Sequence, residues 1–68
     1  MSFDYRKLWK ILIDKKLSKK NLMELTSITS ATMAKMGKGQ PVSMEVLGRI
    51  CKVLEVNIGD IVDYVGDE

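Results

Sequence analysis

The sequence has no histidine and a single cysteine, Cys51, among its 68 residues. One cysteine cannot form a disulfide within the chain, and the usual Cys/His ligand set of a zinc site is missing. Without histidine, Cys51 also lacks the common base that would activate it as a nucleophile, so we expect an inert, packed thiol. Stability must then come from the apolar core, and we expect no metal and no cofactor.

Long apolar runs and the usual features of enzymes are missing as well. No segment approaches the roughly 18 apolar residues of a membrane span, and the opening stretch MSFDYRKLWK places charges where a signal peptide has its apolar run. There is no glycine-rich phosphate loop, and a chain this short leaves little volume for a substrate cavity. We expect a cytoplasmic protein that is not an enzyme, does not enter a membrane and has no small-molecule effector.

The composition is that of a packed globular domain, with 46% apolar residues and one proline. A chain of this length forms one domain, here 1–68 with a core of about 4–65. Such a domain buries only about 60% of the surface that its unfolded chain exposes. We therefore expect a small margin of stability.

Charge is unevenly distributed along the chain. Residues 1–40 hold nine Lys/Arg and three Asp/Glu, a net charge of +6, whereas residues 41–68 hold two and six, a net charge of −4. A basic first part indicates a surface that faces a polyanion. The alternative interpretation is a solvated helical surface whose asymmetry is accidental.

Apolar residues recur with helical spacing, and no segment alternates as a strand would. The spacing predicts five short helices, at about 4–16, 19–26, 30–36, 44–55 and 57–65. The apolar stripe of the first consists of Tyr5, Leu8, Trp9, Leu12 and Ile13. Polar residues suited to helix N-termini stand at Asp4, Ser18, Thr29 or Ser30, Ser43 and Asn57. We therefore predict an all-α fold, a compact bundle of about five short helices.

Two of these helices, 19–26 and 30–36, are short and are joined by only three residues. A helix-turn-helix has this layout, and its second helix enters the DNA major groove. The inward residues would be Leu22, Ile28, Met33 and Met36, and the outward ones Ser30, Ala31, Thr32, Ala34 and Lys35. The alternative is a plain surface turn in which the Ser and Thr residues only cap helices.

The outward residues suit contact with base edges. Ser and Thr hydroxyls can bond bases, the methyl groups of Ala31 and Thr32 can touch a thymine methyl, and Lys35 can reach guanine or a phosphate. Lys19 and Lys20, at the start of the preceding helix, are placed for phosphate contact together with the N-terminal amides. We interpret Lys15 and Lys16 as a solvated helix junction.

The segments that combine these features are LSKKNL at 17–22, SIT at 27–29, TMAKM at 32–36, Gly39 and PVSMEVL at 41–47, followed by Arg49-Ile50-Cys51, Leu54 and Asp60-Ile61. Together they resemble the small single-domain branch of the Cro/phage-repressor-type (XRE-like) helix-turn-helix family. The resemblance implies a lambda-repressor-like bundle that binds double-stranded DNA sequence-specifically and acts as a transcriptional regulator, a repressor. The positions it implies for DNA contact are Lys19, Lys20, Thr29, Ser30, Ala31, Thr32 and Lys35, with Lys38 and Gln40 in the following loop.

The chain departs from the family pattern at several positions. Ser27 stands where the family has glycine in the turn, so it must accept a positive φ, and Met23 replaces a small alanine. Lys19 replaces a glutamine that contacts phosphate. The reading helix also lacks Arg, Asn and Gln, the side chains that make bidentate base contacts, so specificity would depend on Lys35, Gln40 and DNA shape.

Two partner hypotheses remain open. Repressors of this class often bind two half-sites as dimers, and the apolar segment 57–65 could form a homodimer contact through the C-terminal helix. The alternative function is a protein-binding adaptor, antitoxin- or anti-repressor-like, that keeps the fold without strong DNA binding. Its contact residues would be Leu25 and Trp9, although Trp9 also fits a core position.

Overall fold

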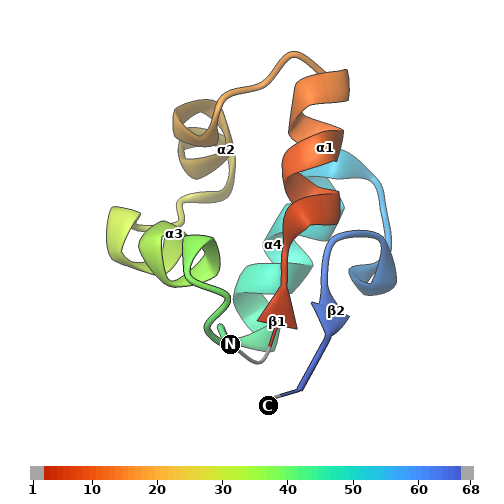
Figure 1. Cartoon of the computed structure of the whole chain (residues 1–68). Helices are drawn as coiled ribbons and strands as arrows, with labels where there is room; N and C mark the ends of the chain where they lie inside the picture. The colour runs from red at the N-terminus through yellow and green to blue at the C-terminus, as the bar shows by residue number, and fades with distance from the viewer. Residues whose placement is uncertain (1–2, 67–68) are drawn as a thin grey trace.

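The computed structural model describes residues 3–66. Its elements, in order, are β1 (Phe3–Asp4), α1 (Arg6–Asp14), α2 (Lys19–Thr26), α3 (Ser30–Gly37), α4 (Met44–Leu54), the 3-10 turn η1 (Ile58–Asp60) and β2 (Asp63–Tyr64). Figure 1 shows α2 and α3 on one side of α1 and α4, with η1 and β2 on the other side. No helix between residues 3 and 66 is long and apolar enough to cross a membrane.

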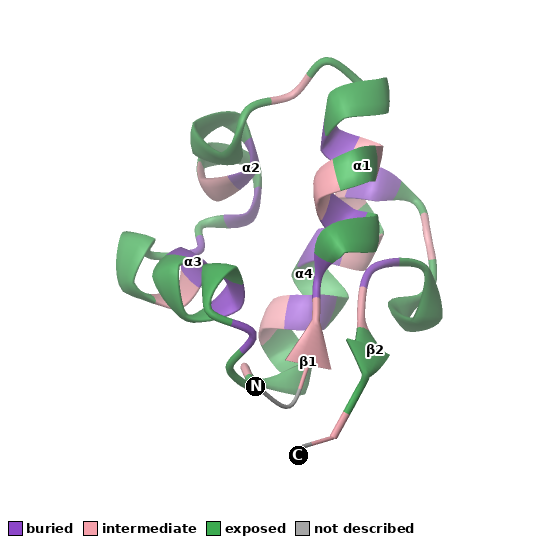
Figure 2. Ribbon diagram, in the orientation of Figure 1, coloured by how far each residue is buried: buried purple, intermediate pink, exposed green. Residues whose placement is uncertain are grey.

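Every helix contributes to one core, as the inward-facing buried positions in Figure 2 show. The buried apolar residues are Tyr5, Leu8, Leu12, Leu22, Ile28, Met33, Met36, Leu47, Ile50, Leu54 and Ile61. The predicted stripe of the first helix is wrong at Ile13, which is 74% exposed. One residue beyond Leu12, its side chain is turned about 100° around the helix, away from the line of Leu8 and Leu12.

Hydrogen-bonded caps begin three of the helices, at residues that the sequence predicted. Ser18, Thr29 and Ser43 each accept a bond from the N–H three residues on, at 3.0, 3.2 and 3.1 Å. At α2 the cap is reciprocal, because the Asn21 side chain accepts the Ser18 N–H at 3.0 Å. These bonds satisfy amides that would otherwise lack a helical partner, and they fix where α2, α3 and α4 start.

The predicted fifth helix at 57–65 is wrong. Only η1 is helical there, and the chain then extends into β2, which pairs antiparallel with β1, placing Tyr64 opposite Phe3. The expectation that the chain has no strand is wrong for the same reason, and the first helix begins at Arg6 because Asp4 belongs to β1. The all-α class is confirmed, with four helices and not five in the described range. A segment of nine residues rich in β-branched side chains is a poor isolated helix, whereas pairing with β1 provides its backbone with partners.

Candidate nucleic-acid interface

The predicted helix-turn-helix is formed by α2, residues 27–29 and α3. Ser27 ends α2 in left-handed backbone with φ of 59°, as expected from its place in the turn. Ile28 is buried at the corner between the two helices, and Met33 and Met36 anchor α3 to the core. The anchoring of one side leaves the other side of α3 facing solvent.

The outer face of α3 consists of small side chains and one lysine. Ser30, Ala31, Ala34 and Lys35 are exposed, whereas Thr32 is half-buried. Such a surface can approach the floor of a groove closely, because no bulky side chain stands in the way. Polar contact with bases from this face would come from the Ser30 hydroxyl and the Lys35 ammonium.

Thr29 has a structural role in addition to its predicted place in the interface. Its hydroxyl accepts the N–H of Thr32 at 3.2 Å and donates to the Thr32 hydroxyl oxygen at 3.1 Å. The proton of the Thr29 hydroxyl is thus used within the free chain, and its oxygen already accepts one bond. Thr29 therefore sets the start of α3, and Ser30 is the first hydroxyl available on its face.

The start of α2 offers charge and free amides in the same place. Lys19 and Lys20 are both exposed. The capping box uses the N–H groups of Ser18 and Asn21, and no bond from the N–H of Lys19 or Lys20 is found among residues 3–66. Two free amides at the positive end of a helix, beside two ammonium groups, are suited to a phosphate oxygen.

Lys19 also makes a contact that the sequence did not reveal. Its Nζ lies over the ring of Trp9 in α1, 4.3 Å from the ring centroid. Trp9 is half-buried. This exposure fits neither a fully buried core position nor a fully exposed anchor for a protein partner. Ten residues and a chain reversal separate the two side chains, so no periodicity within one helix could have indicated the contact.

The loop after α3 is fixed in place by its backbone. Gly39 has φ of 72°, and its N–H and that of Gln40 bond back to the carbonyls of Met36 and Lys35 at 3.1 and 2.9 Å. The Tyr5 hydroxyl donates to the Gln40 carbonyl at 2.9 Å, and burial raises the pKa of Tyr5, which keeps that donor protonated. Gln40 and the neighbouring Lys38 are exposed on this anchored loop.

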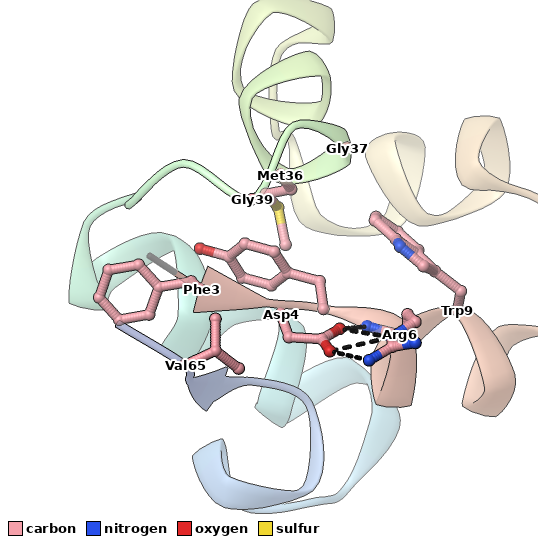
Figure 3. Close-up of a pocket in the computed structure, with 9 residues that line it drawn as sticks. Phe3, Asp4, Arg6, Trp9, Met36, Gly37, Gly39 and Val65 are labelled. Atoms are coloured by element: carbon pink, nitrogen blue, oxygen red, sulfur yellow. Dashed lines mark hydrogen bonds and ion pairs between the residues drawn. The ribbon is translucent and has the colours of Figure 1, made fainter. Parts of the chain in front are cut away.

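A hollow lies where this loop meets the N-terminal segment, and Figure 3 shows its lining. Met36, Gly37 and Gly39 line one side, and Phe3, Asp4, Tyr5, Arg6, Trp9 and Val65 line the rest. The Arg6 guanidinium donates to the Asp4 carboxylate, with Nη2 2.6 Å from Oδ2, and these bonds hold the pKa of Asp4 below its usual value. The polar groups here bond one another and position the ends of α1 and α3.

Within residues 3–66, the lysines of the candidate interface form no ion pairs. The ion pairs found among residues 3–66 are Arg6–Asp4, Lys7–Asp63 and Arg49–Glu45. Lys19, Lys20, Lys35 and Lys38 take part in none of them. The structure brings these four to α2, α3 and the loop that follows, where their charge is available to phosphates.

Cys51 is the remaining candidate for reactive chemistry. It lies half-buried in α4, and burial, with a smaller effect of the Asp60 carboxylate, raises the pKa of its thiol. A thiol held protonated is a weak nucleophile. The geometry supports the packing role that the sequence indicated.

Comparisons with known proteins agree with this geometry. A family model described as "Cro/C1-type HTH DNA-binding domain" matches residues 7–67. The chain is 38% identical over 60 residues to the "Uncharacterized HTH-type transcriptional regulator YozG" of Bacillus subtilis (strain 168), across 85% of this chain and 71% of that protein. It also superposes on a crystal structure of the transcriptional regulator VanUg (Form II) with a TM-score of 0.93 and 39% identity, covering 97% of this chain and 88% of that one.

Proposed function

The chain belongs to the Cro/C1-type helix-turn-helix DNA-binding family, and on that premise we propose that it recognises a specific duplex sequence through α3 and represses transcription. The observation that supports this most directly is the exposed face of α3, which carries small side chains and is flanked by lysines that form no ion pair among residues 3–66. A domain bound across a promoter blocks polymerase without needing another surface. The proposal implies a site of action in the cytoplasm.

Residues in this interface divide into three roles. Ser30, Ala31, Thr32 and Lys35 face the base edges, where Lys35 provides the strongest donor. Lys19, Lys20, Lys38 and Gln40 contact the phosphate backbone on either side, and Thr29 fixes the start of the reading helix. Phosphate contacts set the register of the protein on DNA, and base contacts set the sequence.

Selection of bound duplexes from a random pool tests the proposal. We expect an enriched motif. Lys35→Ala should weaken binding and broaden the motif at one position, whereas Lys20→Ala should weaken binding to all sequences by a similar factor. A pool that shows no enrichment, or a Lys35→Ala protein that selects the unchanged motif, would contradict the assignment of α3 as the reading helix.

We also propose that two copies bind two half-sites about one DNA turn apart. The predicted contact through a C-terminal helix must be revised, because η1 and β2 replace that helix. Tyr64 and Val65, 73% and 52% exposed, provide apolar surface at this end of the chain. A palindromic selected motif and a dimer in sedimentation with duplex would support pairing, and a single half-site bound by one copy would contradict it.

One observation favours the second candidate function, a protein-binding adaptor. Leu25 of α2 is 56% exposed and lies beside Arg49, Lys52 and Val53 of α4. An adaptor would use this apolar spot for a protein partner, and Leu25→Ser should then abolish capture of that partner. The DNA proposal instead predicts that Leu25→Ser leaves duplex affinity unchanged.

A further inference from the structure

The contact between Trp9 and Lys19 joins α1 to the start of α2. The Lys19 ammonium lies over the indole ring at 4.3 Å from its centroid, and Trp9 is the one tryptophan of the chain. We propose that Trp9 is a positioning residue for DNA binding, which holds the Lys19 ammonium at the N-terminus of α2 where it meets a backbone phosphate. This inference rests on the proposed function.

Lysine alone is a poorly ordered phosphate ligand. Its charge sits at the end of a flexible four-carbon chain, and binding must restrict that chain at a cost in entropy. In this protein both ends of Lys19 are held before DNA arrives. The capping box between Ser18 and Asn21 fixes its backbone, and the ring face attracts its ammonium.

The ring leaves the ammonium able to donate. An ammonium has three N–H donors and the indole face engages one side of it, so the opposite side remains open to a phosphate oxygen. No ion pair within residues 3–66 competes for Lys19. The free N–H groups of Lys19 and Lys20 stand at the same helix end, so amides and ammonium can engage one phosphate together.

Trp9 is itself well placed to act as a rigid support. It belongs to α1, whose Leu8 and Leu12 are buried in the core. Its ring also lines the hollow beside Met36 and Gly37 at the end of α3, as Figure 3 shows. Trp9 thus lies between the Lys19 side chain at the start of α2 and the hollow at the end of α3.

A double-mutant cycle on duplex affinity tests the inference. Trp9→Leu keeps an apolar side chain without a ring, and Lys19→Met keeps the length without the charge. With a labelled duplex from the selection at fixed salt, Trp9→Leu should weaken binding about two- to fivefold, the factor expected for an exposed cation–π contact. The same change in the Lys19→Met background should have no further effect, and Trp9→Phe should recover part of the loss. An equal loss in both backgrounds would overturn the inference, because Trp9 would then act independently of Lys19.

Proton NMR of the free protein provides a readout without DNA. The Lys19 Hε protons should be shifted upfield by the ring current of Trp9, strongly in the wild type, weakly in Trp9→Phe and not in Trp9→Leu. An unshifted wild-type signal would overturn the contact itself, whatever the protein binds. A shifted signal in a protein that binds no duplex would instead refute the proposed function, and the phosphate role of Lys19 with it.

Discussion

Ser27 is one of three residues other than glycine with left-handed backbone in the described range, with Lys16 and Glu55. Each follows a helix at a point where the chain must reverse direction, after α1, α2 and α4. Left-handed backbone costs an L-residue with a Cβ roughly 1–2 kcal/mol. The fold tolerates this cost because the geometry of the helix-turn-helix and its neighbours requires these reversals.

Replacing Ser27 by glycine should therefore stabilise the protein. Removing the Cβ relieves the left-handed strain, and the greater freedom of glycine in the unfolded chain offsets part of the gain. We expect the free energy of unfolding to rise by about 0.5–1 kcal/mol, measured by urea denaturation. Ser27→Ala keeps the Cβ and is the matched control without this gain. A Ser27→Gly protein no more stable than Ser27→Ala would contradict the argument.

Asp4 contributes to the stability of the folded state in a pH-dependent way, and the direction of this dependence follows from its contacts. Its carboxylate accepts the N–H of Arg6 at 2.8 Å and the Arg6 guanidinium, and the pKa of Asp4 is lowered from 3.8. The folded state thus favours the charged form, so the stabilisation is present above about pH 3.8 and is lost as the pH falls through the lower folded pKa.

Asp4→Asn should be less stable than the wild type at pH 7 and should lose less stability on acidification, measured by thermal unfolding from pH 6 to pH 2. Arg6→Gln is the companion variant, because it removes the charged donor and leaves the carboxylate. Arg6→Gln should also reduce the loss of stability that acidification causes. Parallel profiles for wild type and Asp4→Asn would show that the carboxylate contributes nothing through its ionisation.

The residues that the sequence predicted correctly have local determinants. The caps at Ser18 and Thr29 depend on backbone groups three residues away, and Ile28 is buried because it sits between two amphipathic helices. The contact of Tyr5 with the Gln40 carbonyl spans 35 residues. That contact depends on the packing of α1 against the loop after α3, and no local pattern contains it.

At the scale of elements, the capping box provides the polar side-chain contacts to the backbone at the N-terminus of α2, and no acidic residue occupies its first turn. Ser18→Ala removes the acceptor for the Asn21 N–H and should cost about 1 kcal/mol of unfolding free energy. The readout is the midpoint of thermal or urea unfolding. Ser30→Ala, at the exposed first position of α3, where the side chain makes no cap bond within residues 3–66, is the control and should stay within about 0.5 kcal/mol of wild type. Equal effects of the two changes would contradict a specific capping role.

The last element shows where helical spacing misleads. Ile58, Ile61, Val62 and Val65 fit a helical stripe, yet Ile58 and Val65 are exposed and only Ile61 is buried. Spacing in a short segment cannot distinguish a helix from a turn followed by extended chain. The deciding partner, β1, lies at the other end of the sequence, and strands of two residues leave no alternation to read.

At the scale of the whole molecule, the basic residues of the first part of the chain serve two purposes. Part of the basic first half is used internally, because Lys7 donates to Asp63 and to the Gly59 carbonyl, both at 3.1 Å, and so ties α1 to the acidic C-terminal segment. The lysines of α2, α3 and the following loop have no such partner within residues 3–66. The net charge of the chain, +2, therefore understates the charge that this side presents to DNA.

The dependence of duplex affinity on salt should reveal how many of these lysines bind phosphate and how many copies bind. Each neutralised phosphate contributes about 0.9 to the slope of log affinity against log salt. Lys19, Lys20, Lys35 and Lys38 then predict a slope of about −3 to −4 for one copy, and about −7 for two copies on paired half-sites. Lys20→Ala should reduce the magnitude by about 1 per copy bound. A flat dependence would contradict phosphate binding by these lysines, and a slope unchanged in Lys20→Ala would remove that residue from the interface.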